Sequence, residues 1–173
     1  VSKGTDELAT SVEKGLQALD EAGCFFAGSL RSADAFRLIS NRVRDLLPFK
    51  LIVLYLVDET RSHLLAVDAD GTGADEYKGK NVSSVSELAG QCYSAGKVET
   101  GHYRKGDSAG HFGSSVAIPL CREDSVFGVL QLFFGKEYDL TCLDPSLFDA
   151  IATRVAPTML GSIAFERTEK NAL

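Results

Sequence analysis

Residues Ser114–Phe134 read SSVAIPLCREDSVFGVLQLFF and contain two short apolar runs separated by a charged tripeptide at 122–124. The runs Val116–Leu120 and Val126–Phe134 are rich in Val, Ile, Leu and Phe, which favours strand over helix. The charged break between them is typical of a turn, so the pattern predicts a β-hairpin. Both faces of each run are apolar, and we therefore expect the hairpin to be covered on both sides.

Two residues of this hairpin indicate how its backbone is arranged. Pro119 has no N–H for a ladder hydrogen bond, so its backbone should face away from the partner strand or lie at a bulge. Gly128 lies inside the second run, where a missing side chain predicts close backbone approach or a kink.

The composition is that of an ordinary globular domain. The chain has 173 residues and a net charge of −6, enough length for one domain with its own core. A net negative charge does not favour binding to nucleic acid or to an anionic membrane. The apolar run Leu51–Val57 is too short to span a bilayer. Cys24, Cys92, Cys121 and Cys142 show no C-x-x-C spacing, so we expect reduced thiols in a cytoplasmic protein.

Apolar periodicity predicts helices in the first part of the chain. A stripe at positions 8, 12, 16 and 19 indicates a helix over 5–22 that Gly23 can end. A second helix is expected to begin with Ser32 as its N-cap and to end at Pro48, with Phe36, Ile39, Val43, Leu46 and Leu47 as its buried stripe.

The remaining elements are predicted from apolar runs and from the polar, glycine or proline residues that interrupt them. We expect strands at 50–58 and 63–69, a polar loop after 70, and a helix over 86–95 that is capped by Ser84 or Ser86 and closed by Gly96. The glycine-rich segment 99–113 is typical of a long loop, and the order of elements leaves a strand or a loop open between the helix over 86–95 and the hairpin. The last helix should start at Asp144, and Pro157 inside it predicts a kink near 153–157 or two segments.

This order of elements predicts an α+β fold in which an antiparallel sheet carries the first and last helices on one face. We expect residues 1–28 to form an N-terminal helix suited to dimerisation or signalling and 29–168 to form the domain. Residues 169–173 would be a C-terminal tail leading to an effector outside this chain.

Two segments of the chain resemble GAF domains. The segment Ala117–Leu120, a charged turn and then Phe127–Leu132 looks like the GAF hairpin, and residues 89–98 resemble the GAF helix that leads into the next strand. The resemblance covers about Leu30 to Thr168. It implies a sheet order of 2-1-5-4-3 or a six-stranded variant, with a ligand pocket under a helix and loops on the face opposite the terminal helices.

Alternation along the strands separates two sets of side chains. One set is apolar: Ile52, Leu54, Leu56, Val116, Ile118, Leu130 and Leu132. The other contains the polar groups that a pocket needs: Val53, Tyr55, Val57, Ser115, Ala117, Val129, Gln131 and Phe133. In GAF domains, the residues that match Tyr55, Ser115 and Phe133 look towards the pocket, so the resemblance and the alternation agree.

The candidate ligand-binding residues come from this second set and from the segments that would cover it. Tyr55, Ser115 and Gln131 are expected as polar contacts. Ala117, Val129 and Phe133 are expected as walls, and His111 and Phe112 as contributions from the loop. Cys92 is on the helix over 86–95 and is either a pocket thiol or a small buried hydrophobe.

Other chemistries fit the residues less well. His63, His102 and His111 match no metal motif. Cys92 is followed by Tyr93, not by the His of bilin-binding relatives, and Asn81 lacks the Lys that follows it in cyclic-nucleotide relatives. The loop before Ser114 has no cysteine, so the resemblance to free methionine sulfoxide reductases fails in detail, and we expect no enzyme activity.

The resemblance thus implies a sensory or regulatory domain of a signal-transduction or transcription-regulating protein. We expect it to bind an unidentified small molecule, to form a homodimer through its terminal helices and to relay the signal to an effector, without nucleic acid or membrane as partners. The alternative is a structural dimerisation module whose pocket is filled by its own side chains. The residues name no cofactor.

Overall fold

The computed structural model describes residues 10–21, 30–58, 60, 63–82, 87–107 and 109–172. The chain divides into two compact units. One comprises residues 49–152, and the other comprises 1–48 together with 153–173. The expected caps Ser84 and Ser86, the stripe residue Leu8 and the helix terminator Gly23 lie outside the described residues.

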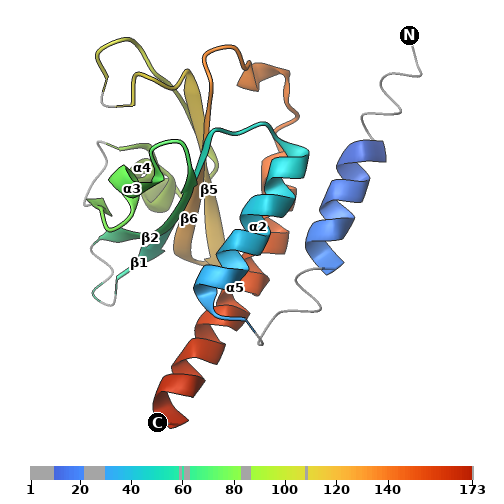
Figure 1. The fold of residues 1–173 in the computed structure, drawn as a ribbon, viewed down its shortest axis with the longest axis vertical. Coiled ribbons are helices and arrows are strands. Elements are labelled where there is room, and N and C mark those ends of the chain that lie inside the picture. The colour runs from blue at the N-terminus through green and yellow to red at the C-terminus, as the bar shows by residue number, and fades with distance from the viewer. Residues whose placement is uncertain are drawn as a thin grey trace. The chain divides into compact units, whose positions relative to one another are not determined.

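The unit formed by residues 49–152 is built on a six-stranded sheet (Figure 1), in the order β3-β2-β1-β6-β5-β4. Every pairing among the described strands is antiparallel. The α+β class and the six-stranded variant expected from the sequence are confirmed. The strands are β1 (Leu51–Val57), β2 (Leu64–Gly71), β3 (Asn81–Val82), β4 (Glu99–His102), β5 (Ser114–Arg122) and β6 (Ser125–Phe134).

The predicted hairpin is the β5–β6 pair. Val116 lies opposite Leu132 and Ile118 opposite Leu130, with a two-residue turn between Arg122 and Ser125. The expectation for Gly128 is also confirmed, because a Cβ at this position would lie 2.6 Å from the backbone oxygen of Tyr55 on β1. A side chain would not fit at this distance, so the position requires glycine where β6 pairs with β1.

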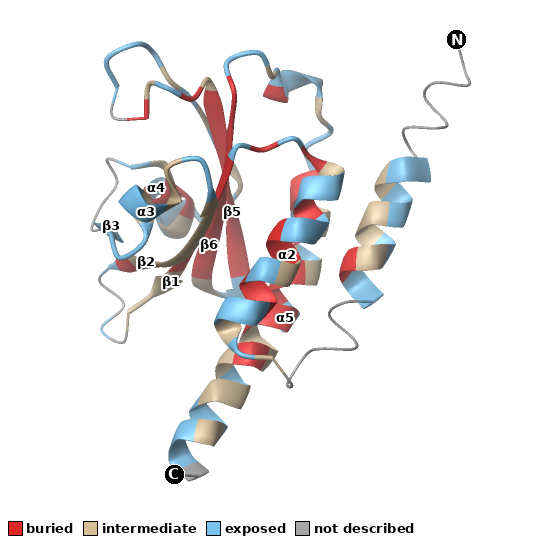
Figure 2. Ribbon diagram, in the orientation of Figure 1, coloured by how far each residue is buried: buried red, intermediate tan, exposed pale blue. Residues whose placement is uncertain are grey.

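The register confirms the two predicted sets of side chains. Val53 lies opposite Gln131 and Tyr55 opposite Val129, while Ser115 lies opposite Phe133. Both sets are buried along the three central strands except for Leu56 and Val57 at the end of β1, which are half-buried, and the red of β5 and β6 in Figure 2 shows this burial. Two-sided burial explains why these strands are continuous apolar runs without alternation.

Short helices cover the polar set. α4 (Leu88–Ala95) contacts β4, β5 and β6, and α3 (Ala74–Tyr77) contacts β1 and β2. α4 ends as expected at Gly96, which has a left-handed φ of 65° and donates its N–H to the Cys92 carbonyl. A 3₁₀ turn, η1 (Leu140–Cys142), precedes the last helix.

One local prediction for this unit is wrong. The segment after residue 70 is expected to be a polar loop, but it contains α3 and the two-residue strand β3. After the helix that ends at Gly96 the sequence leaves a strand or a loop open, and the structure has a strand, because Glu99–His102 pairs with Ser114–Ala117 as β4. Both segments are too short and too polar for periodicity to reveal, and they form because an adjacent strand offers hydrogen-bond partners.

The other unit contains helices. They are a helix over residues 10–21, α2 (Ser32–Leu46) and the continuation of α5 (Ser146–Ala172) from residue 153 onward. Asp144 caps the N-terminus of α5 as expected, since its carboxylate accepts the Ser146 N–H at 3.0 Å. The expectation of two helical segments is wrong, because α5 continues through Pro157 as one helix. It also includes residues 169–172 of the expected tail.

The N-terminus of α2 differs from the prediction. The N-cap position is Arg31, and Ser32 is the first helical residue. The Ser32 N–H and hydroxyl instead donate to Glu166 Oε1 of α5, at 2.7 and 2.9 Å. A carboxylate distant in sequence thus takes the role of a local cap, because the helix N-terminus attracts negative charge.

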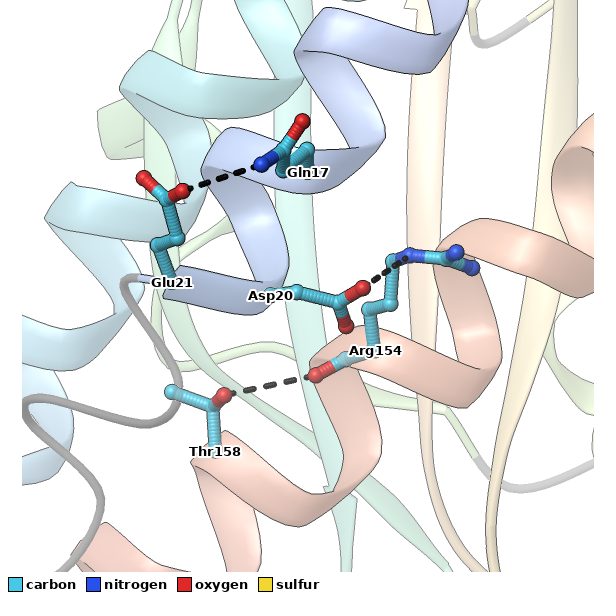
Figure 3. Close-up of polar contacts among 5 residues, drawn as sticks. All are labelled: Gln17, Asp20, Glu21, Arg154 and Thr158. Carbon is cyan, nitrogen blue, oxygen red and sulfur yellow. Dashed lines mark hydrogen bonds and ion pairs between the residues drawn. The ribbon is translucent and has the colours of Figure 1, made fainter.

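The helix over 10–21 contacts both other helices of its unit. Figure 3 shows Asp20 on this helix pairing with Arg154 on α5, at 3.2 Å. A Cβ at Gly15 would lie 2.2 Å from Leu46 Cδ2 of α2, so the glycine allows close packing of the two helices. Leu19 is 3% exposed, whereas Val12 and Leu16 are half-buried.

Candidate functional site

A cavity of about 330 Å³ lies within the unit formed by residues 49–152. This volume is at the lower end of the range of about 300–1,000 Å³ typical of small-molecule sites. Its lining comes from β1, β6, β4, α3, α4 and the segment after β4. The lining residues are Tyr55, Tyr77, Lys80, Glu87, Leu88, Gln91, Thr100, Gly101, Tyr103, Ala109, Gln131 and Phe133.

Three polar side chains form a hydrogen-bonded group at one wall of this cavity. The hydroxyls of Tyr103 and Ser115 are 2.6 Å apart. Gln131 Nε2 donates to Ser115 Oγ at 3.0 Å and to the Tyr103 hydroxyl at 3.5 Å. Ser115 is fully buried and Gln131 is 4% exposed, so each needs these partners to offset its desolvation.

Aromatic rings surround Phe133 at the same wall. The ring centroids of Tyr77, Phe112 and Tyr103 lie 5.2, 5.0 and 6.1 Å from that of Phe133, and the Tyr103 ring is stacked on it with an interplanar angle of 15°. Such offset and tilted pairs are favourable arrangements of aromatic rings. They give the cavity a wall that is flat, apolar and held from several elements.

Tyr55 projects from β1 into this cavity and is only 2% exposed. Within the described residues its hydroxyl makes no hydrogen bond, unlike that of Tyr103. Burial, followed by the charge of Glu87, raises the pKa of Tyr55 well above its ordinary value of 10.0. Tyr55 therefore stays neutral at physiological pH and offers a hydroxyl that can donate or accept.

Two charged side chains of opposite sign line the cavity at exposed positions. Lys80 Nζ lies 5.2 Å from the centroid of the Tyr77 ring, within the range of a cation–π contact. The carboxylate of Glu87, at the start of α4, forms no hydrogen bond or ion pair with any residue in the described ranges. Within the described part of the chain, the ammonium of this lining therefore has a partner and the carboxylate has none.

The structure brings several of the sequence-predicted site residues to this cavity. Tyr55, Gln131 and Phe133 line it, and Ser115 lies directly behind, bonded to Gln131. Ala117, Val129 and Phe112 are buried in the apolar cluster on the same side of the sheet but are not lining residues. His111 is exposed, with its ring centroid 4.1 Å from that of Phe112.

Cys92 also belongs to that buried cluster and does not line the cavity. The side chain is fully buried, and burial raises the pKa of its thiol to about 12. At neutral pH it is therefore a thiol, and a thiol is a poor nucleophile compared with a thiolate. This is the small buried hydrophobe that the sequence offered as one of two alternatives.

Sequence reasoning missed the lining residues that do not come from the central strands. These are Tyr77, Lys80, Glu87, Leu88, Gln91, Thr100, Gly101, Tyr103 and Ala109. One feature of the sequence could have identified Tyr103: it is an aromatic residue in a glycine-rich segment that precedes a strand with a predicted polar face.

In the described ranges, no cluster of three or more His, Cys, Asp and Glu side chains is placed to hold a metal ion. No helix there is long and apolar enough to cross a membrane.

Comparison with known proteins gives the family. The family model described as "GAF domain" matches residues 37–170, and the chain belongs to this family. A search of curated proteins found no match. GAF domains are mostly regulatory, so the family supports a sensory or regulatory domain in general terms.

Solved structures show the same fold. The GAF domain of a phosphoenolpyruvate-protein phosphotransferase from Coxiella burnetii is 15% identical, with a TM-score of 0.72 over 95% of this chain and 99% of that chain. The corresponding Acinetobacter domain is 16% identical, with a TM-score of 0.69 over 88% and 94%. Free methionine-R-sulfoxide reductase from Neisseria meningitidis is 15% identical, with a TM-score of 0.64 over 88% and 92%. At these identities the similarity concerns the fold.

Proposed function

We propose that this chain is a GAF-type sensory domain that binds a small molecule in the cavity between the sheet, α3, α4 and the segment after β4. The observation that carries the proposal is the Tyr55 hydroxyl, which belongs to a lining side chain and has no hydrogen-bond partner among the described residues. Such a hydroxyl is available to a ligand, and small-molecule sites combine apolar walls with a few polar groups of this kind.

The lining is suited to transmitting a change in occupancy. Tyr103, Ala109 and Thr100 come from β4 and the segment that follows it, so a ligand that contacts them orders that segment relative to the central strands. α5 begins in the unit formed by residues 49–152 and continues into the helical unit as one helix. The proposal is that ligand binding favours one arrangement of these elements and that the terminal helices relay it to an effector.

A homodimer formed through the terminal helices is part of this proposal. Val12 and Leu16 of the helix over 10–21 are half-buried, and so are Leu160 and Ile163 of α5. These side chains leave apolar surface for a second copy, and a two-fold pair of helices gives a symmetric path for the signal. Light scattering over a range of concentrations tests it; a monomer at the highest concentration contradicts it.

The test of ligand binding is mass spectrometry of freshly purified protein under native and denaturing conditions. We expect a small molecule that is retained in the native spectrum and lost on denaturation, and its mass gives the ligand class. Tyr55→Phe should reduce its occupancy, whereas Tyr138→Phe, which changes a tyrosine outside the lining, should not. Protein without a retained molecule, and without a thermal shift with nucleotides, heme, amino acids or aromatic acids, contradicts the proposal and favours a structural dimerisation module.

The reductase-like activity of some structural relatives is the enzymatic alternative. That chemistry requires a thiolate nucleophile close to a resolving thiol. Cys92 is buried as a neutral thiol, and Cys121 and Cys142 are exposed. We expect no turnover of free methionine sulfoxide with a dithiol reductant. Turnover that is lost in Cys92→Ser overturns this part of the proposal.

A further inference from the structure

The two charged side chains that line the cavity differ in their partners. Glu87 and Lys80 form no ion pair with each other, and the Lys80 ammonium already lies over the Tyr77 ring. The Glu87 carboxylate has no partner among the described residues. A ligand that entered this cavity would therefore meet a carboxylate without a hydrogen-bond or ion-pair partner in the described ranges, and a positively charged group of the ligand is favoured beside it.

The neutral groups of the lining favour the same sign of charge. The aromatic residues Tyr77, Tyr103 and Phe133 line the cavity, and the face of an aromatic ring attracts cations. Gln131 makes both of its hydrogen bonds through Nε2. The acceptor Oε1 therefore remains for a ligand donor.

The electrostatic effect of Glu87 reaches several of these groups. After burial, Glu87 is the largest contribution to the raised pKa of Tyr55. It also helps to raise the pKa of Tyr103 and, after the larger effects of burial, Tyr103 and Glu76, that of Tyr77. One carboxylate thus acts on all three tyrosines of the lining, which places its negative charge at their common cavity.

We propose that the ligand is a small organic amine, protonated at neutral pH, whose ammonium group lies beside Glu87 and whose apolar body lies against Phe133 and Tyr77. This inference rests on the proposed function, because it names the ligand class of the same cavity. Hydrogen-bond acceptance by the Tyr55 hydroxyl and Gln131 Oε1 completes the site for the N–H donors of the amine.

Lys80 has a specific role in this arrangement. Its ammonium occupies the Tyr77 face in the free protein, so it is the resident cation that an incoming amine competes with and is repelled by. The inference therefore makes an asymmetric prediction for two side chains of the same lining. Removing the charge of Glu87 weakens binding, and removing the charge of Lys80 strengthens it.

The experiment is isothermal titration of the full chain with three probes that share one phenylethyl body: 2-phenylethylamine, 3-phenylpropionate and phenylalanine. They present a cation, an anion and a zwitterion. We expect 2-phenylethylamine to bind about fivefold to tenfold more tightly than 3-phenylpropionate, since both rim charges are exposed and screened. Glu87→Gln should weaken amine binding about fivefold, and Lys80→Met should strengthen it about twofold to fivefold.

A matched control is Lys78→Met. Lys78 is two positions from Lys80, equally a surface lysine, and pairs with Asp68 at 3.8 Å outside the lining. Its substitution should leave the affinity for 2-phenylethylamine unchanged. An equal gain in Lys78→Met and Lys80→Met would mean that only the net charge of the protein matters, and it would overturn the inference.

The other outcomes separate this inference from the proposed function. Tighter binding of 3-phenylpropionate, strengthened by Glu87→Gln and weakened by Lys80→Met, shows an anion site. Tightest binding of phenylalanine, weakened by both variants, shows a zwitterion site. Either result overturns the amine inference and leaves a small-molecule sensor in place. If none of the probes binds, the amine inference fails, and the retained molecule in native mass spectrometry decides the proposed function.

Discussion

The two faces of β1, β5 and β6 are equally buried but differ in chemistry. Ile52, Leu54, Ile118 and Leu130 on one face are all fully buried and apolar. The other face holds Tyr55, Ser115 and Gln131 among its apolar residues, and it borders a cavity. Burial alone therefore does not separate core from site in this domain. The hydrogen-bonded group of Tyr103, Ser115 and Gln131 distinguishes the face to which we assign ligand binding.

The largest test of this difference is a truncation on the apolar face. Leu130→Ala removes a fully buried side chain of β6, and we expect it to lower the free energy of unfolding by about 2–5 kcal/mol. Chemical denaturation measures the change. Cys121→Ala, at an exposed position on β5, is the control and should stay within about 0.5 kcal/mol of the parent. A loss below about 1 kcal/mol for Leu130→Ala would mean that this face is not tightly packed.

The neighbouring residue on the opposite face gives a smaller stability effect and a larger functional one. Gln131→Leu removes the donor to Ser115 Oγ, but Ser115 keeps its contact with Tyr103. We expect the unfolding free energy to fall by about 1 kcal/mol and ligand occupancy to be lost. Denaturation and native mass spectrometry provide the two readouts. Full occupancy in Gln131→Leu would contradict the assignment of this face to binding.

Alkaline pH tests the polar face through its tyrosines. Burial, with smaller contributions from Tyr103, Glu76 and Glu87, raises the pKa of Tyr77 to about 12, above its ordinary value of 10.0. Because the folded-state pKa is the higher one, the associated stability is fully present below pH 10 and is lost as the pH rises towards 12. Stability should therefore fall over this window, and less steeply in Tyr77→Phe. Identical pH profiles for the two proteins would contradict it.

The smallest expected change in unfolding free energy comes from breaking an exposed polar contact, and it serves as a reference for the buried contacts. The Asp20–Arg154 pair in the helical unit is 3.2 Å long, but the Asp20 side chain is 55% exposed. Asp20→Asn should cost less than about 1 kcal/mol, and the cost should vanish at high salt. Salt-dependent denaturation checks this. A loss as large as that of Leu130→Ala would show that a surface contact, not the sheet, dominates stability.

The central strands could be predicted from the sequence because they satisfy strong rules. The run at 126–134 is apolar on both faces and too short for a buried helix, and alternation then assigns Tyr55, Ser115 and Gln131 to one face without knowledge of the pairing. Gly128 was identifiable because a glycine inside a strand indicates close backbone approach. The strands, their two faces and the role of Gly128 can each be inferred from a short stretch of sequence, given that the strands pack in one sheet.

The rim of the cavity could not be predicted in this way. Lys80 and Glu87 are charged residues, and in a sequence they are expected at the surface. They line the cavity because they lie next to β3 and at the start of α4, on the same face of the sheet. Tyr77 belongs to a one-turn helix that has no periodicity to detect. Glu166 replaces a local cap for α2 although 134 positions separate it from Ser32. Contacts of this kind depend on tertiary structure, which single-sequence patterns do not encode.

The most direct test of the account uses the five tyrosines of the chain. Carbon-13-labelled tyrosine allows NMR spectra to be followed during titration with 2-phenylethylamine. Tyr55, Tyr77 and Tyr103 line the cavity, whereas Tyr93 and Tyr138 do not and serve as internal controls. The account predicts saturable shifts of the three lining tyrosines with the two others unchanged. Shifts confined to Tyr93 or Tyr138, or uniform small shifts of all five, would contradict the claim that the polar face of the sheet is the binding site.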